Sequence, residues 1–132
     1  MRRLALAIPS ALILAACIEE PPVDGRTAYM EDCAACHGTD GMGTGELAEN
    51  LIQAPPDLTR LAAMNGGVFP RDYVMTTIDG YARGAHFSAA MPEFGAGDLG
   101  PTVIVEDGEG NGIPVPQRLL VLTEYLESIQ RP

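Results

Sequence analysis

Apolar residues recur at helical spacing in four stretches of the chain, and this pattern predicts a mainly α-helical protein. The four stretches are residues 24–32, 57–63, 70–79 and 118–129. The last is the clearest, because Leu119, Leu122 and Leu126 fall on one face of a helix. Asp24 and Asp57 are suited to cap two of these helices, and Gly80 to end the third.

A different pattern follows the third helical stretch. Residues 102–105 and 113–115 are short runs rich in Val and Ile, separated by an acidic, glycine-rich segment. The two runs predict a small β-hairpin near residues 102–115. The acidic segment does not match the EF-hand calcium pattern, so its carboxylates are expected to face water.

The first residues have the pattern of an export signal. Arg2 and Arg3 precede an apolar run, residues 4–16, that is too short to span a bilayer comfortably. The run ends in Leu-Ala-Ala before Cys17, which resembles the lipobox of bacterial lipoproteins and implies a lipid on the Cys17 sulfur. An uncut signal anchor and ordinary cleavage near Ala16 are the alternatives.

This interpretation divides the chain into three parts. Residues 1–16 are a signal peptide, residues 17–23 carry the lipidated cysteine and a proline-containing tether, and residues 24–132 form one domain. The expected location is the periplasmic face of a bacterial membrane, either the inner or the outer one.

Charge narrows the choice of partners. The 132-residue chain has a formal net charge of −10 and contains no lysine. Without Arg2 and Arg3, six arginines face eighteen acidic residues, a net charge of −12. Nucleic-acid binding is therefore not expected, whereas a protein partner with a basic docking face suits this charge.

The candidate chemistry is concentrated in one segment, Cys33-Ala34-Ala35-Cys36-His37. Two cysteines three apart followed directly by a histidine is the spacing that attaches a c-type haem through thioethers. Three alternatives are a thioredoxin-like redox pair, half of a zinc site completed by His86, and a structural disulfide. The polar residues before Cys33 disfavour the first, the shortage of ligands disfavours the second, and the third gives His37 no role.

The same segment lies in a longer pattern that resembles the opening of class I c-type cytochromes: Gly25, Tyr29, Cys33, Cys36, His37 and Gly38 at the family's spacing. The resemblance implies an all-α fold of three to five helices around one covalent haem c, with the terminal helices crossed near Gly25. It also implies a proline carbonyl on the second nitrogen of the proximal histidine. Pro55 or Pro56 could supply that carbonyl, and the alternative is that the two prolines simply form an extended entry to the next helix. The hairpin is an insertion that departs from the family pattern.

The sixth iron ligand distinguishes an electron carrier from a ligand-binding haem. Met91 is the expected distal ligand, because Met91-Pro92 resembles the Met-Pro loop of class I cytochromes and lies far enough along the chain to reach the opposite face. His86 is the rival ligand. Arg71 and Arg83 are candidate partners of the haem propionates.

These inferences predict a single-electron carrier between redox proteins, not an enzyme. Two alternatives remain at this point. In the first, the chain would be a haem subunit docked on a larger respiratory oxidoreductase. In the second, it would be a ligand-binding haem sensor or peroxidase-like protein with a labile sixth ligand.

Overall fold

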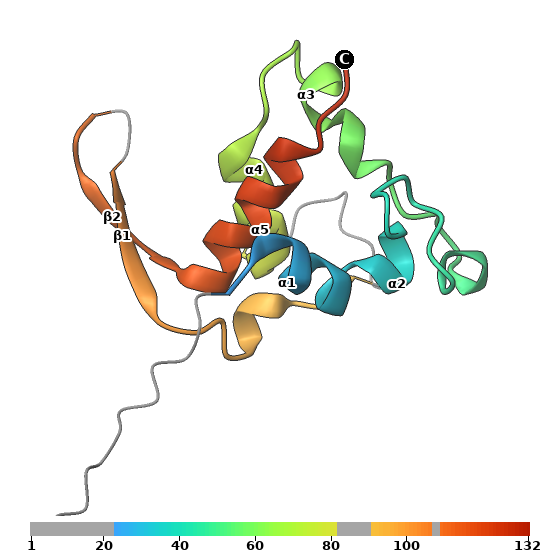
Figure 1. The fold of residues 1–132 in the computed structure, drawn as a ribbon, viewed down its shortest axis with the longest axis horizontal. Coiled ribbons are helices and arrows are strands. Elements are labelled where there is room, and N and C mark those ends of the chain that lie inside the picture. Colours follow the sequence, from blue (N-terminus) through green and yellow to red (C-terminus); the bar gives the residue numbers. More distant parts are fainter. Residues whose placement is uncertain (1–22, 82–90, 107–108) are drawn as a thin grey trace, which may run out of the picture.

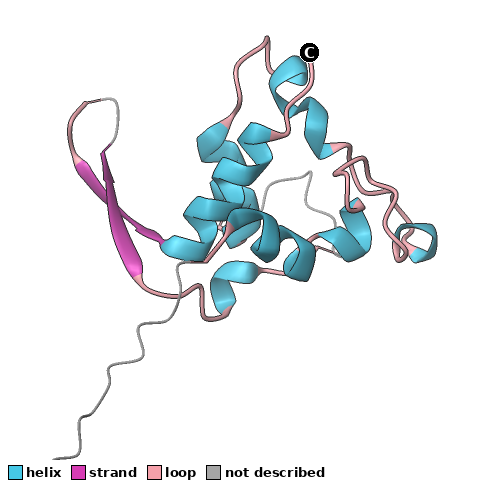
Figure 2. Cartoon of the chain, viewed as in Figure 1, coloured by secondary structure: helices cyan, strands magenta, loops and turns pink. Residues whose placement is uncertain are grey.

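The computed structural model describes residues 23–81, 91–106 and 109–132. In this part of the chain, five α-helices and one two-stranded antiparallel sheet are joined by loops and short 3-10 turns (Figures 1 and 2). The helices are α1 (Gly25–Asp32), α2 (Ala34–His37), α3 (Leu61–Met64), α4 (Arg71–Asp79) and α5 (Gln117–Ser128). The mostly helical architecture confirms the class I cytochrome c fold.

The first and last long helices, α1 and α5, cross in close contact. A Cβ atom at Gly25 would clash with the carbonyl oxygen of Val121, so glycine permits this approach. One turn further along α1, Tyr29 is fully buried and its ring lies 5.1 Å from the ring of Tyr125. The predicted crossing of the terminal helices is therefore present.

The core is formed where α4 joins this pair. Val74 and Ile78 of α4 pack with Leu119, Leu122 and Leu126 of α5 in one apolar cluster. Helix α4 ends as predicted at Gly80, whose φ of 90° lies in the left-handed region that favours glycine.

Two predicted elements differ in detail. The stretch expected to form one helix from Asp57 begins as a 3-10 turn, Leu58–Arg60, and only then becomes α3. The Asp57 carboxylate caps this turn as predicted, accepting from the N–H of Thr59, two residues on. The expected loop after Met91 also contains a 3-10 turn, Phe94–Ala96.

The predicted hairpin is present as β1 (Thr102–Glu106) and β2 (Gly112–Pro116). Ile104 pairs with Pro114 and Val103 with Val115. Figure 1 shows the hairpin extending away from the helices, with β2 leading directly into α5. Val115 is buried and anchors the base of the hairpin in the core.

An ion-pair cluster joins the ends of the two crossed helices. Arg118, at the start of α5, donates to Asp32 and to Glu31 at the end of α1, each at 2.7 Å. Arg118 and Asp32 are only 22% exposed. Sequence reasoning missed this cluster because its members lie 86 and 87 residues apart.

Within the described residues, no helix combines the length and apolar character that crossing a bilayer requires.

Candidate functional site

The Cys-x-x-Cys-His segment lies at the junction of α1 and α2. Cys33 ends α1, and α2 follows at once as a single turn closed by the His37 N–H donating to the Cys33 carbonyl at 2.9 Å. Cys33 and Cys36 are half-buried and are not joined by a disulfide. Burial, aided by the negative charge of Asp32, raises the pKa of the Cys33 thiol to about 12. The turn therefore holds two cysteine sulfurs one helical turn apart.

The ring of His37 is oriented by a main-chain carbonyl. Its Nδ1 atom lies 3.3 Å from the carbonyl oxygen of Pro56. Burial lowers the pKa of His37, and the contact with Pro56 opposes part of that effect. Because a carbonyl oxygen only accepts hydrogen bonds, Nδ1 must carry the proton, and the neutral ring keeps the Nε2 lone pair for a metal. Of the two candidate prolines, it is Pro56 whose carbonyl lies beside the ring.

The glycine-rich loop after His37 folds back onto α2. The N–H of Gly43 donates to the carbonyl of His37 at 2.8 Å, and that of Gly45 to the carbonyl of Cys36 at 3.1 Å. A Cβ atom at Gly45 would clash with the Ala35 carbonyl, so the loop needs glycine to come this close. On the other side, the buried Tyr29 hydroxyl donates to the Gly38 carbonyl at 2.7 Å. The segment is thus held by α1 and by its own loop.

The remaining predicted site residues fall into two groups. Cys17, Arg83 and His86 lie outside the described residues. Met91 is described, and it is half-buried and packed against the core. Arg71 makes an ion pair with Glu127 of α5 at 2.8 Å, an interaction the sequence did not predict.

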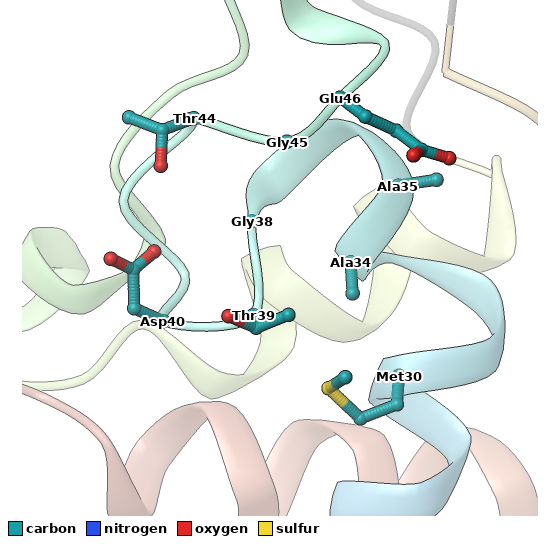
Figure 3. A pocket seen from close by; sticks show the side chains of 9 residues that line it. All are labelled: Met30, Ala34, Ala35, Gly38, Thr39, Asp40, Thr44, Gly45 and Glu46. Atoms are coloured by element: carbon teal, nitrogen blue, oxygen red, sulfur yellow. The ribbon is translucent and has the colours of Figure 1, made fainter.

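A hollow of about 380 Å³ lies beside the attachment turn (Figure 3). One wall is formed by Met30, Ala34 and Ala35, and the other by the loop from Gly38 to Glu46. None of the predicted haem contacts Cys33, Cys36, His37 and Met91 lines this hollow, so it is not the haem site that the sequence predicts.

The apolar surroundings of the core are suited to a haem. Several large apolar side chains pack against the buried cluster while keeping part of their surface exposed. They are Leu58, Leu61, Phe69, Met75, Met91 and Phe94. A porphyrin is a flat, largely apolar ring, and covering such half-exposed side chains is favourable. Together with the two thiols and the oriented imidazole, these residues fit a covalently attached haem.

The fold and this donor set define a c-type cytochrome. Residues 20–106 match the model of the family described as cytochrome C oxidase, cbb3-type, subunit III, and the chain belongs to this family. No curated protein and no solved structure matches the chain. The protein is therefore a haem-based electron carrier with covalently bound haem c.

Proposed function

We propose that the chain passes single electrons between redox proteins at the periplasmic surface of a bacterial membrane. Its haem c would be attached through Cys33 and Cys36 and would supply a one-electron couple at the iron. The observation that carries this proposal is the Nδ1 contact of His37 with Pro56 at 3.3 Å. That contact fixes the ring and leaves Nε2 for the iron, as expected of a proximal ligand.

Met91 is proposed as the distal ligand. It is half-buried beside the core cluster, and Pro92 restricts the backbone next to it. A thioether that closes the second face of the iron leaves no position for a substrate and suits electron transfer. His86 is the rival, and a histidine in that place would lower the reduction potential.

The location and the partners are part of the same proposal. A lipid on Cys17 and the short tether to residue 23 would keep the domain close to the membrane surface. Six tether residues at ~3.3–3.6 Å each reach at most about 20 Å. The net charge of −12 after removal of Arg2 and Arg3 suits a basic docking face on the partner.

The native, membrane-extracted protein provides the test. A pyridine-haemochrome spectrum of c type and pigment retained in acidified organic solvent are expected, with a redox titration that fits one electron. Pigment released by the solvent would refute covalent attachment. Rapid carbon monoxide binding at neutral pH would refute the methionine-closed carrier and favour the ligand-binding alternative.

A second candidate is a haem subunit docked permanently on a larger oxidoreductase. The family's name, which is that of an oxidase subunit, favours it. Extraction at low and at high salt separates the two candidates. A free carrier held by charge leaves its partner as salt rises, whereas a permanent subunit stays bound.

A further inference from the structure

The two edges of the hairpin differ in their ability to pair with another strand. Directly after β2, the N–H of Gln117 donates to the Pro101 carbonyl at 2.8 Å. Backbone groups of successive residues in an antiparallel strand point alternately towards the partner strand and away from it. The odd-numbered residues of β2 therefore direct their backbone groups towards β1. The even-numbered Pro114 and Pro116 therefore face outwards. Since proline has no N–H, the outer edge of β2 lacks two of the donors that a further strand requires.

The outer edge of β1 has no such protection. Thr102, Ile104 and Glu106 pair with Pro116, Pro114 and Gly112, so their N–H and C=O groups point away from β2. Among the described residues, no hydrogen bond from outside the hairpin reaches the backbone of these three residues. Figure 1 shows the hairpin clear of the helices. An edge of three residues is open to pairing.

The side chains along this edge suggest what a partner strand would carry. Ile104 is 70% exposed and lies between Thr102 and Glu106 on one face, whereas Val105 on the other face packs against the core. An exposed isoleucine in the middle of an open edge favours association, and proteins usually block such edges. This edge offers one apolar position and, two residues away, one carboxylate.

The sequence that contains the hairpin is acidic as far as Arg118, which is itself paired with Glu31 and Asp32. Residues 84–117 contain five acidic residues and neither lysine nor arginine. The five are Glu93, Asp98, Glu106, Asp107 and Glu109. A second copy of this chain would bring the same negative charge to the edge. A basic segment would be attracted to it instead.

We propose that the open edge of β1 binds an extended, basic segment of a partner protein by β-strand addition. The incoming strand would place an apolar side chain beside Ile104 and an arginine or lysine beside Glu106, two residues apart. Backbone hydrogen bonds to Thr102, Ile104 and Glu106 would hold it. The inference does not depend on which residues ligate the iron.

The test uses the reduced holoprotein and a capped synthetic peptide, Arg-Thr-Val-Thr-Arg, whose symmetry allows either strand direction. Binding is expected to shift the backbone amide resonances of Thr102, Ile104 and Glu106 and to slow their hydrogen exchange. The control peptide has the same sequence with an N-methyl group on every residue, which removes the N–H groups that pair in either strand direction. Equal binding of the two peptides would overturn the proposal.

Two variants separate edge pairing from attraction by charge. Ile104→Pro removes an outward N–H without removing a bond of the hairpin, and we expect it to abolish the shifts while helical circular dichroism is kept. Glu106→Gln, which leaves the backbone intact, should lower the affinity for the peptide about two- to fivefold. Shifts that map elsewhere, or a concentration-dependent dimer that Ile104→Pro disperses, would contradict a basic partner segment.

Discussion

Replacing Gly25 by alanine tests whether the crossing of α1 and α5 is as close as the structure indicates. The new methyl group would clash with the carbonyl oxygen of Val121 and would lie 3.0 Å from Cβ of Tyr125. The carbonyl belongs to the backbone of a helix and has no rotamer by which to move away. The two helices would have to separate at the point where they cross.

The sign of the effect follows from two opposed terms. Exchanging glycine for alanine in a helix normally stabilises a protein by about 0.5–1 kcal/mol, because glycine loses more backbone entropy on folding. Overpacking a well-filled contact costs about 1–3 kcal/mol, and a fixed backbone neighbour places this site at the upper end. We therefore expect Gly25→Ala to lower the free energy of unfolding by about 2–2.5 kcal/mol.

The assay is equilibrium urea unfolding of the holoprotein, followed by far-ultraviolet circular dichroism. Gly97→Ala is the control, since Gly97 has an extended backbone and a Cβ there would meet, among the described residues, only the Phe94 carbonyl, at 3.4 Å. That variant should unfold within about 0.5 kcal/mol of the parent. If Gly25→Ala unfolds at the same urea concentration as Gly97→Ala, the close crossing is wrong.

Three further predictions concern the site, the ion pairs and a helix cap. Met91→Ala should abolish the weak far-red ferric band of sulfur ligation, whereas Met64→Ala, at a side chain 75% exposed, should leave it unchanged. Arg118→Met should cost about 1–3 kcal/mol in urea unfolding, because it leaves a half-buried carboxylate unpaired. Arg71→Met, at an exposed pair, should cost less than about 1 kcal/mol. The cap hydrogen bonds of Asp57 hold its pKa below the usual 3.8, so its stabilising contribution should be lost as pH falls through that lowered pKa.

Each of these has a clear contrary result. A far-red ferric band that survives Met91→Ala would show that a residue other than Met91 supplies the sulfur ligand. Equal costs for the two arginine variants would mean that the burial of the Arg118 cluster contributes nothing. For the cap, Asp57→Asn keeps the hydrogen-bond acceptor but not the titration, so the difference from the parent should shrink as the pH falls from 7 towards 3. An unchanged difference would exclude the pKa shift.

The sequence predicted the elements of this fold better than their contacts. Helix stops and caps are local signals, and Asp24, Asp57 and Gly80 all perform the predicted roles. The two Val- and Ile-rich runs on either side of the acidic, glycine-rich segment predicted the hairpin. The start of the helix after Asp57 was wrong in type, because the first turn is a 3-10 turn, a form common at helix N-termini that the apolar pattern does not distinguish from an α-helix.

Contacts between distant charged residues were not predictable in the same way. Arg71 was a candidate for a haem propionate, yet its guanidinium pairs with Glu127, 56 residues away. A single arginine at the start of a helix, such as Arg118, gives no local signal of an ion pair. Its role depends on how α5 crosses α1, which no local pattern encodes, although the glycine that permits the crossing is visible in the sequence.

The choice between Pro55 and Pro56 illustrates the same limit within the site. What orients His37 is a carbonyl oxygen, and every residue has one, so residue type does not distinguish the two positions. The selection depends on how the glycine-rich loop meets the proline pair. A Cβ atom at Gly43 would clash with the Pro55 carbonyl, so glycine lets the two segments come this close, and the Pro56 carbonyl lies beside the His37 ring. This contact joins two segments distant in the sequence, and residue type at the two prolines does not encode it.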